Sequence, residues 1–541
     1  MQNQVRTRKP HSPNRYPKKV HPLLLAEQHE NRLDKLLKSA AGTGSMARRS
    51  EARMTHTLQL LDSVTVEKVL AEAFELIESP GVRVAPIAAE LLRSAGVRVS
   101  DGIAHIPEAI VRRALGTAPR EFLLYTRDGQ PAVCYGGDSV HFDPGSSCLN
   151  ILDSESGRSR LAQAADLSQL VKIAEVLPEY SAQSTAMVCS DVPQEIGDFY
   201  RLFVVLWYSN KPVVTGAFSG PTLQAMIELL VADAGGAERL RKKPRAVFDV
   251  CPSPPLNWSD FASENMVQLA RAGVPAEMVS MPLAGATAPV TLIGSVAQHA
   301  AESLGGLAIH QLAAPGAPIV WGGAPAIFDM SSGGTPMGAI ETVMLNLACT
   351  QVGKHLGLPT HGYMVTTESK CIDGQAGMES ATSAALGALA GINMISGAGM
   401  LDSLACHSLE KLVIDAEAIA SAQRLRRGID SSYSSFATQM FAQIGLSGDF
   451  LKLKETRTLF RSEQHFPSTV THRGEIPEGT IPKDILSRAR DRVRELHDAY
   501  VRPAFDADGK RRKMEVATRV AQSAGLERLP GIELDTVAEP S

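Results

Sequence analysis

Five segments between residues 276 and 417 decide the fold of this chain. They are PLAGATAPVTL at 282–292, AQHAAE at 297–302, PGAPIVWGG at 315–323, TTESKCIDGQAGMES at 366–380 and LEKLVIDAE at 409–417. The middle segment places a short apolar run between Pro and Gly residues, which is typical of a buried strand. AQHAAE belongs to a longer apolar stretch of helical length. Strand and helix therefore alternate in this part of the chain.

The same alternation extends outward in both directions. Helices are expected at 194–208, 221–234, 260–272 and 295–313. Strands are expected at 185–189, 212–216, 246–251, 277–282, 318–322, 359–364 and 392–397. Seven strand–helix units are visible and an eighth is easily hidden, so the pattern favours a closed (βα)8 TIM-type barrel in the α/β class over an open doubly wound sheet.

The chain divides into four predicted regions. Residues 1–50 are basic and rich in Pro, Asn, Gln and Ser, so we expect a flexible arm. Residues 51–160 predict N-terminal helices followed by a small antiparallel sheet, because FLLYT, AVCYGG, VHFD and LNILD are separated by turn sequences. Residues 161–475 would form the barrel. Residues 476–541 would form a C-terminal tail with one exposed amphipathic helix at 484–500.

Composition excludes several classes of partner and compartment. A formal net charge of −4 gives no field that would attract nucleic acid or an anionic membrane. The seven cysteines are scattered without close pairs, which argues against disulfides and favours a cytoplasmic location. The start of the chain lacks the apolar run of a signal peptide. The charge-free run 383–401 contains four glycines, so a buried helix and strand explain it better than a membrane span.

Polar and aromatic residues at the ends of the predicted strands are the site candidates, because barrel enzymes place their active sites there. Trp321 ends an apolar strand, and an aromatic face attracts a quaternary ammonium group, although core packing would explain this residue equally well. Any of these side chains could instead satisfy loop backbone groups. The seven candidates are Asp249, Trp321, His361, Tyr363, Glu368, Lys370 and Asp373.

Metal and hydrolytic chemistry have weaker support. The sequence contains neither HExxH nor CxxC, and His299 with Glu302 is a poor ligand pair, so no metal site is expected. No GxSxG segment is present. Glu368 and Asp373 could supply two carboxylates on one loop, which leaves a lyase or hydrolase as an alternative.

Together the five segments resemble the trimethylamine methyltransferase family, and the likeness extends over residues 153–473. The resemblance implies a (βα)8 barrel that passes an amine methyl group to the cobalt of a separate corrinoid protein. No cofactor would then be bound tightly, since the partner supplies the corrinoid. We also expect a homo-oligomer, because large barrels commonly form symmetric assemblies.

The resemblance also suggests the substrate. Founding members of the family carry pyrrolysine in the active site, and Lys370 lies near where that residue would be expected. Members without pyrrolysine use betaine-like quaternary amines, so glycine betaine or a relative is implied. Another methylated amine, or a barrel that binds amines without transfer, are the alternatives.

Roles for the candidates follow from the same resemblance. Trp321 and Tyr363 would face the cation, and Asp249 or Glu368 would add negative charge. Lys370 or His361 would pair with a substrate carboxylate. The loop residues Lys370, Glu368 and Asp373 would serve the transfer itself.

Overall fold

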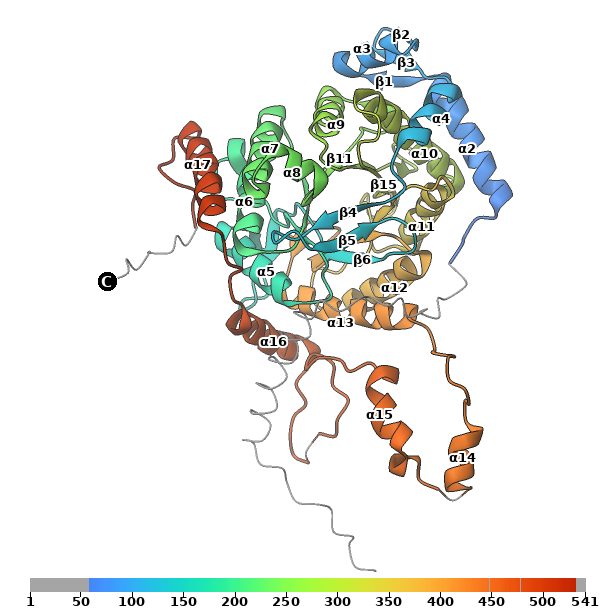
Figure 1. Ribbon diagram of the computed structural model, residues 1–541, viewed down its shortest axis with the longest axis vertical. Coiled ribbons are helices and arrows are strands. Elements are labelled where there is room, and N and C mark those ends of the chain that lie inside the picture. The colour runs from blue at the N-terminus through green and yellow to red at the C-terminus, as the bar shows by residue number, and fades with distance from the viewer. Residues whose placement is uncertain (1–57, 447, 477, 532–541) are drawn as a thin grey trace, which may run out of the picture. The chain divides into compact units, whose positions relative to one another are not determined.

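The computed structural model describes residues 58–446, 448–476 and 478–531, which lie in a compact unit spanning 52–541 (Figure 1). The predicted arm at 1–50 lies outside the described residues. The divisions proposed at residues 160 and 475 stay predictions.

Two parallel sheets form the centre of this unit. Five strands lie in the order β15-β13-β11-β10-β9, and three lie in the order β17-β18-β6. The strands are β6 (His141–Pro144), β9 (Gln183–Ser184), β10 (Val213–Gly216), β11 (Ala246–Val250), β13 (Ala276–Ser280), β15 (Ile319–Gly323), β17 (His361–Tyr363) and β18 (Met394–Ala398). Six of the seven predicted strands coincide with these, and the first is shifted toward the N-terminus.

Backbone hydrogen bonds connect the two sheets at both edges. Trp321 N donates to Pro359 O at 2.8 Å, and Trp321 also forms a parallel bridge with Thr360, which links β15 to β17. At the other edge, Ser181 N donates to Phe142 O at 2.9 Å, which links β9 to β6. Each of the eight strands therefore has a neighbour on both sides.

Strand β6 corrects the expectation for residues 121–159. The segment VHFD was expected in an antiparallel sheet, but β6 pairs in parallel with β18, with His141 opposite Met394. It is the eighth strand that the sequence pattern concealed, because four residues followed by turn-like sequence do not reveal the direction of pairing. Antiparallel pairing in this region is confined to β4 (Phe122–Tyr125) with β5 (Pro131–Tyr135) and β7 (Asn150–Leu152) with β8 (Ser159–Leu161).

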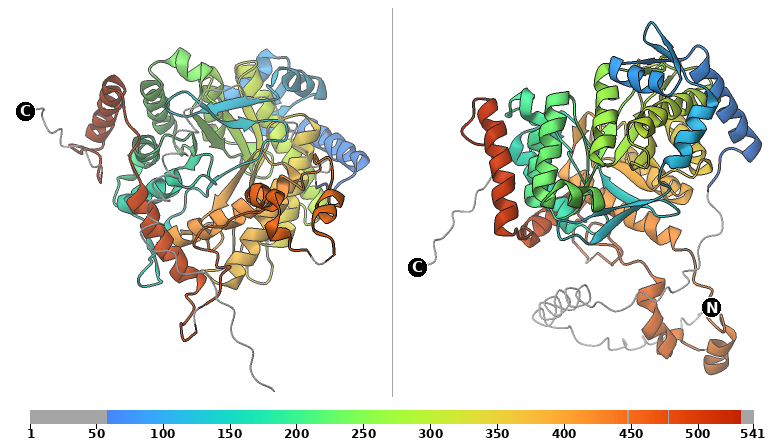
Figure 2. Two further views of the ribbon diagram at one scale, coloured as in Figure 1. Left: turned by 60° about the horizontal axis from the view of Figure 1, so that its bottom comes forward. Right: turned by 45° about the horizontal axis from the view of Figure 1, so that its top comes forward.

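Helices surround these strands (Figures 1 and 2). The four predicted helices are confirmed as α6, α7, α9 and α10. Ser259 begins α9 by accepting a hydrogen bond from Ala262 N, and Gly273 ends it in the left-handed conformation. The helices following the strands are α5 (Ala164–Val176), α6 (Gly197–Tyr208), α7 (Gly220–Ala234), α8 (Ala237–Lys242), α9 (Asp260–Ala272), α10 (Leu292–Ala313), α11 (Ile340–His355), α12 (Gly374–Ala390) and α13 (Leu409–Arg426).

The strands have two distinct faces. One face packs on the helices. The other, which we call the inner face, carries Val214, Val247, Val320 and Met394, and these pack against the β4–β5 hairpin. All four lie in the first half of their strands, so the hairpin covers the inner face at the amino ends of the strands.

The N-terminal region combines the predicted helices with a sheet that was not predicted. Helices α2 (Ser63–Glu78), α3 (Pro86–Ser94) and α4 (Glu108–Thr117) accompany a four-stranded sheet in the order β12-β1-β3-β2. Its strands are only two or three residues long, which is too short for an alternating pattern to register. They are β1 (Val82–Val84), β2 (Arg98–Ser100), β3 (Ile103–His105) and β12 (Asn257–Trp258).

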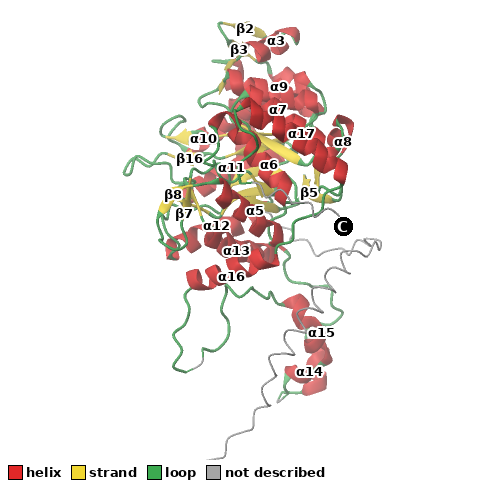
Figure 3. Ribbon diagram, turned by 90° about the vertical axis from the view of Figure 1, so that its left-hand side faces the viewer, coloured by secondary structure: helices red, strands yellow, loops and turns green. Residues whose placement is uncertain are grey.

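Past α13 the chain forms further helices, shown from another side in Figure 3. The predicted helix at 484–500 is confirmed as α16 (Ile485–Ala499). Helix α17 (Ala507–Ser523) was not predicted; its Lys513 pairs with buried Asp233 of α7 at 2.5 Å. The other elements are α14 (Thr438–Ile444), α15 (Lys454–Glu463), β14 (Leu283–Ala284), β16 (Ala326–Ile327), β19 (Met400–Leu401) and β20 (Cys406–His407).

The expectation for the charge-free run is met. The charge-free run 383–401 folds into the end of α12 and strand β18. Within the described ranges, no helix has the length and apolar character needed to cross a membrane. All seven cysteines are free thiols.

Two adjacent glycines in α10 test the packing of this helix on Trp258. A Cβ on Gly306 would lie 2.1 Å from Trp258 Cζ2, whereas a Cβ on Gly305 would make ordinary contacts at 3.6 Å. We expect Gly306→Ala to lower the free energy of unfolding by roughly 1–3 kcal/mol, as overpacking does. Gly305→Ala should be neutral or stabilising, since alanine favours helix. Urea unfolding of both variants measures this, and equal stability would contradict the packing described.

Candidate active site

Next to the apolar layer that packs on the hairpin, in the direction of the carboxyl ends of the strands, the inner face becomes polar. Asp249 follows Val247 on β11 by two residues, and Glu277 is its direct partner on β13. His361 on β17 and Ser396 on β18 continue this level, and Asp143 on β6 completes it. We call these five residues the inner acidic cluster. Because alternate residues of a strand share one face, five strands deliver them to the same place.

Close contacts join four members of this cluster in a row. Ser396 Oγ donates to Asp143 Oδ1 at 2.6 Å, and His361 Nε2 lies 2.9 Å from Ser396 Oγ. We assign a proton to Nε2, because the serine hydroxyl already donates to the carboxylate. His361 Nδ1 lies 2.8 Å from Glu277 Oε1. That last contact is close enough to share a proton, although it lacks the alignment of a hydrogen bond.

Burial and like charge hold protons on the carboxyl groups. Loss of solvent, with the other carboxyls adding to it, raises the pKa of Asp143 and of Asp249 well above the ordinary range. Desolvation raises the pKa of Glu277 to about 8. Desolvation also lowers the pKa of His361 to about 4, so this ring is neutral at physiological pH. Among charged groups, the other members of the cluster have the largest effect on the pKa of Asp143, Asp249 and His361.

Some carboxyl oxygens in the cluster have no partner. Asp143 Oδ2 and Asp249 Oδ1 are buried and have no hydrogen-bond partner. Asp143 is also fully buried as a whole residue. Such atoms are costly inside a protein unless a ligand or a proton satisfies them. Asp249 is half-buried, so the cluster reaches solvent on that side.

Two tyrosines border the cluster. The hydroxyl of Tyr135, which belongs to the hairpin, lies 3.4 Å from Glu277 Oε2 on the amino-end side of the cluster. Tyr363 lies on the opposite side, where its hydroxyl is 3.4 Å from Asp249 Oδ2 and 3.0 Å from Ser146 Oγ. The Tyr363 ring meets the His361 ring edge-on at 5.1 Å. Aromatic surface and negative charge therefore lie side by side.

Gly322 makes room for the Glu277–His361 contact. A Cβ at this position of β15 would lie 3.0 Å from Glu277 Cγ and 3.1 Å from His361 Nδ1. Any larger residue would push these two side chains apart. The Gly-Gly ending of PGAPIVWGG thus has a local structural cause.

Trp321 does not join the inner acidic cluster and lies in the helix-facing core, which was the alternative explanation for this residue. Its neighbours in β15, Val320 and Gly322, face inward, so Trp321 faces the helices. Its indole Nε1 donates to Cys349 O of α11 at 2.9 Å, and its ring contacts His299 of α10. The side chain is almost completely buried in this core.

The described contacts of the three loop residues are with other loop and helix-cap groups and not with the inner acidic cluster. Glu368 accepts from Gly338 N at 3.0 Å and from the hydroxyl of Ser403, which holds two loops together. Asp373 caps α12 by accepting from Ala376 N at 3.0 Å. Lys370 is 80% exposed and pairs with Asp402 at 2.9 Å.

Of the seven predicted site residues, Asp249 and His361 belong to the inner acidic cluster and Tyr363 borders it, whereas Asp143 and Glu277 were not among the predicted residues. Asp143 was hidden because its strand was assigned to a different sheet. Glu277 had a detectable signal, since it is an acidic residue inside an otherwise apolar predicted strand. Such a residue must be paired or functional.

A metal-binding role has no support in the described part of the chain, where no group of three His, Cys, Asp or Glu side chains is arranged to hold an ion. His299 and Glu302 are occupied elsewhere. His299 Nε2 contacts Gly322 O at 3.1 Å, and Glu302 accepts from Ser280 Oγ at 2.5 Å.

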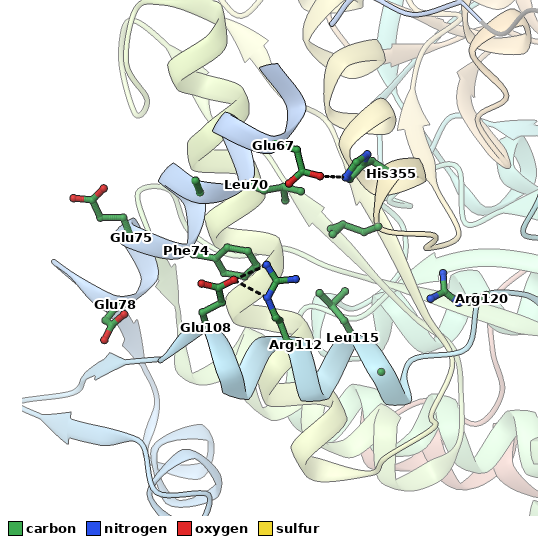
Figure 4. Close-up of a pocket in the computed structure, with 13 residues that line it drawn as sticks. Glu67, Leu70, Phe74, Glu75, Glu78, Glu108, Arg112, Leu115, Arg120 and His355 are labelled. Carbon is green, nitrogen blue, oxygen red and sulfur yellow. Dashed lines mark hydrogen bonds and ion pairs between the residues drawn. The ribbon is translucent and has the colours of Figure 1, made fainter. Parts of the chain in front are cut away.

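A cavity lies away from these residues (Figure 4). It has a volume of about 700 Å³ and lies between α2 and α4, next to the end of α11. The cavity has Leu70, Phe74 and Leu115 among its lining residues, and Glu67 pairs with His355 across its edge at 2.8 Å. Since helices that follow parallel strands run back along them, the end of α11 marks the amino-end side. This cavity is therefore separate from the inner acidic cluster.

Comparison with known proteins identifies the family. The sequence profile described as Trimethylamine methyltransferase (MTTB) matches residues 28–523. The chain belongs to this family. Trimethylamine methyltransferase MttB2 of Methanosarcina mazei is 30% identical over 465 residues, which cover 83% of this chain and 93% of that protein.

Two relatives from Desulfitobacterium hafniense carry different names. Trimethylamine methyltransferase MttB is 27% identical over 409 residues, with 76% of this chain and 80% of that protein covered. Glycine betaine methyltransferase is 26% identical over 453 residues, with 83% and 94% covered. The family resemblance carried by the five segments is confirmed, and the chain is a methyltransferase of the trimethylamine methyltransferase family.

Replacement of Trp321 in this methyltransferase should affect folding. Trp321→Ala would leave a large void between β15 and the helices and leave Cys349 O unpaired. We expect a loss of about 3–5 kcal/mol in the free energy of unfolding. Trp321→Phe should lose less, because the ring still fills most of the space. Urea unfolding measures both, and an alanine variant as stable as the natural protein would contradict this placement.

Proposed function

We propose that this chain moves a methyl group from a quaternary ammonium compound, such as glycine betaine, to the Co(I) centre of a separate corrinoid protein. Family membership supports the methyl transfer. The observation that carries the choice of a cationic substrate is the inner acidic cluster. Asp143 and Glu277 are buried in it, and each of its three carboxyl groups has one buried oxygen without a hydrogen bond.

We also infer that the eight parallel strands close into one (βα)8 barrel. The hydrogen bonds from Trp321 N to Pro359 O and from Ser181 N to Phe142 O support this, since they join the sheets at both edges. In such a barrel the inner acidic cluster lies inside, toward the carboxyl ends of the strands, where barrel enzymes have their active sites.

A cationic ligand suits this cluster better than an anion or a neutral molecule. Three carboxyls without a nearby lysine or arginine among their dominant neighbours need either protons or a positive ligand. A quaternary ammonium group has no N–H to donate, so it binds through charge and through aromatic faces. Tyr363 and His361 offer such surfaces beside Asp249.

The reaction needs little covalent help from the protein. The quaternary nitrogen departs as a neutral tertiary amine and keeps the electron pair of the broken C–N bond, while the corrinoid partner supplies the nucleophile that forms the new bond to carbon. The chain's contribution is to hold the methyl carbon in line and to exclude water, which together lower barriers by several kcal/mol. This route does not require a pyrrolysine.

The loop residues keep a part in the proposal. Glu368 and Asp373 accept hydrogen bonds from backbone N–H groups. Lys370 pairs with Asp402 but its side chain remains exposed to solvent. We propose that it attracts the carboxylate of a betaine. His361 is excluded from that role because it is neutral and already in contact with Ser396 and Glu277.

The deciding experiment mixes the protein with a Co(I) corrinoid protein and a panel of quaternary and tertiary amines, and follows methylation of cobalt by absorbance. We expect turnover with at least one quaternary amine. Glu277→Gln keeps the size of the side chain but removes its charge, so the affinity for that amine should fall at least about tenfold. Amine binding without methyl transfer would leave only a binding protein, and turnover without any corrinoid protein would indicate a different chemistry.

Lys370→Ala is the matched control in the same assay. It should weaken glycine betaine, which carries a carboxylate, and leave tetramethylammonium unaffected. An equal loss of affinity for both ligands would show that Lys370 does not bind the substrate carboxylate.

The pH dependence of binding gives an independent prediction. Below about pH 8 the free protein holds a proton on Glu277, and a bound cation must displace it. The affinity for tetramethylammonium should therefore rise with pH and level off near pH 8, by up to tenfold per pH unit for one proton released. Calorimetry in buffers of different ionisation enthalpy measures the released protons. A flat profile between pH 6 and 8 would contradict the role of Glu277.

The stability of the free protein should change in the opposite direction. Because the pKa of Glu277 is raised in the folded form, proton binding stabilises that form, and this contribution is lost as pH rises toward 8. Thermal unfolding with and without the ligand should show the largest stabilisation by the cation at the alkaline end of this range.

A further inference from the structure

Strands β10 and β11 carry the part of the inner face that solvent can reach next to the inner acidic cluster. Asp143 and Glu277 of the cluster are fully buried. In contrast, Asp249 and Gly216 are partly exposed, and Cys251 is exposed. Gly216 is the direct partner of Asp249 in the parallel register. We call Gly216, Asp249 and Cys251 the β10–β11 patch.

Strand alternation turns the members of this patch toward the inner face. Val214 packs on the hairpin, so Gly216, two residues later on β10, shares its face. Val247 also packs on the hairpin, and Asp249 follows it on the same face. Cys251 continues this order one residue past the end of β11. A ligand that reaches Asp249 therefore passes between Gly216 and Cys251.

The surroundings of Cys251 support this position. The thiol is exposed to solvent, yet desolvation by the surrounding protein raises its pKa to about 12, and the negative charges of Asp249 and Glu277 add to the rise. Exposure and desolvation would conflict on a flat surface, but they agree for a group on a recessed part of the surface. Cys251 thus borders the inner acidic cluster on its solvent side.

Gly216 leaves space beside Asp249. A Cβ on Gly216 would lie 3.5 Å from Asp249 O and 3.7 Å from Asp249 Cβ, which are ordinary contacts. The φ of Gly216 lies outside the left-handed region, so the backbone does not require a glycine here. Gly322 is different, because a Cβ there would press on Glu277 and His361. The missing side chain at Gly216 therefore has no cause in local packing or in backbone conformation.

Asp249 supplies the charge in the middle of the patch. The hydroxyl of Tyr363 lies 3.4 Å from Asp249 Oδ2, whereas Asp249 Oδ1 has no hydrogen-bond partner. A quaternary ammonium group cannot donate a hydrogen bond and presents alkyl groups in every direction. It needs a carboxylate that is bordered by surfaces suited to alkyl groups. The bare backbone of Gly216 and the polarisable sulfur of Cys251 are such surfaces.

We propose that Gly216 and Cys251 determine the size of the ammonium group that binds at Asp249. This inference rests on the proposed function and extends it to the choice of substrate. The glycine and the small thiol admit a trimethylammonium group and also bulkier quaternary ammonium groups, and a larger side chain at either position excludes the bulkier ones. One methylene more or less in a binding site changes affinity by roughly 10–200-fold.

Calorimetric titration of the full chain with a series from tetramethylammonium to tetraethylammonium tests the proposal. The natural protein should bind bulkier members as well as tetramethylammonium. Gly216→Val should lower the affinity for the bulkiest bound member at least about tenfold more than the affinity for tetramethylammonium. Cys251→Leu should act in the same direction. Cys251→Ser keeps the size of the side chain and should leave the order of affinities unchanged.

Gly116→Val is the matched control, because a Cβ on Gly116 of α4 meets no atom within 4 Å and lies away from the patch. It should bind the series like the natural protein, and circular dichroism checks that all variants are folded. A natural protein that binds only tetramethylammonium, or an order of affinities unchanged in Gly216→Val and Cys251→Leu, would overturn this inference and leave the proposed function standing. If no member of the series binds the natural protein, the cationic substrate itself is wrong.

Thiol labelling tests the position of Cys251 without any substitution. Cys251 and Cys371 are the two exposed cysteines of the chain. A methanethiosulfonate reagent that carries a trimethylammonium group is added at pH 9, because the raised pKa slows the reaction of Cys251. Tetramethylammonium at ten times its Kd should slow labelling of Cys251 about tenfold and leave Cys371 unaffected, as measured by peptide mass spectrometry. Labelling of Cys251 at the same rate with and without bound tetramethylammonium would overturn the proposal.

Discussion

The cost of enclosing several carboxyl groups in one place is the constraint on which this structure depends. Asp143, Asp249 and Glu277 come from three different strands, and no single local pattern requires them to meet. Their burial is tolerable only because Ser396, the two tyrosines and retained protons offset part of the desolvation. The surrounding architecture holds these groups together against their mutual repulsion. Under the proposed function, this arrangement would bind a positively charged substrate.

Much of the architecture could be read from the sequence, because alternation of apolar strands and helices is a strong signal. Six strands and all four named helices around them fell where the pattern placed them. The errors occurred where elements are very short. Strand β6 has four residues and β9 has two, and β6 pairs with β18, which lies more than 250 residues away in the chain. Such long-range pairing cannot be recognised from the pattern of residues in a short stretch of sequence.

The candidate site was recovered only in part, for related reasons. The inward or outward direction of a side chain depends on the register of its strand, and a shift of one residue reverses it. Trp321 therefore seemed as suitable as His361 until the structure showed that it faces α11. Glu368 and Asp373 illustrate another limit. Capping and loop-bridging carboxylates have the same composition as catalytic ones, and three-dimensional contacts alone separate them.

The β4–β5 hairpin has a kinetic consequence. The hairpin covers the inner face at the amino ends of the strands, so a substrate of the proposed reaction would reach the inner acidic cluster from the side of the partly exposed Asp249. If a bulky methyl acceptor arrives by that same route, the small amine has to be loaded first, and the demethylated product is trapped until the acceptor departs. In the proposed reaction, a route shared by both reactants would thus require the amine to bind before the acceptor and to leave after it.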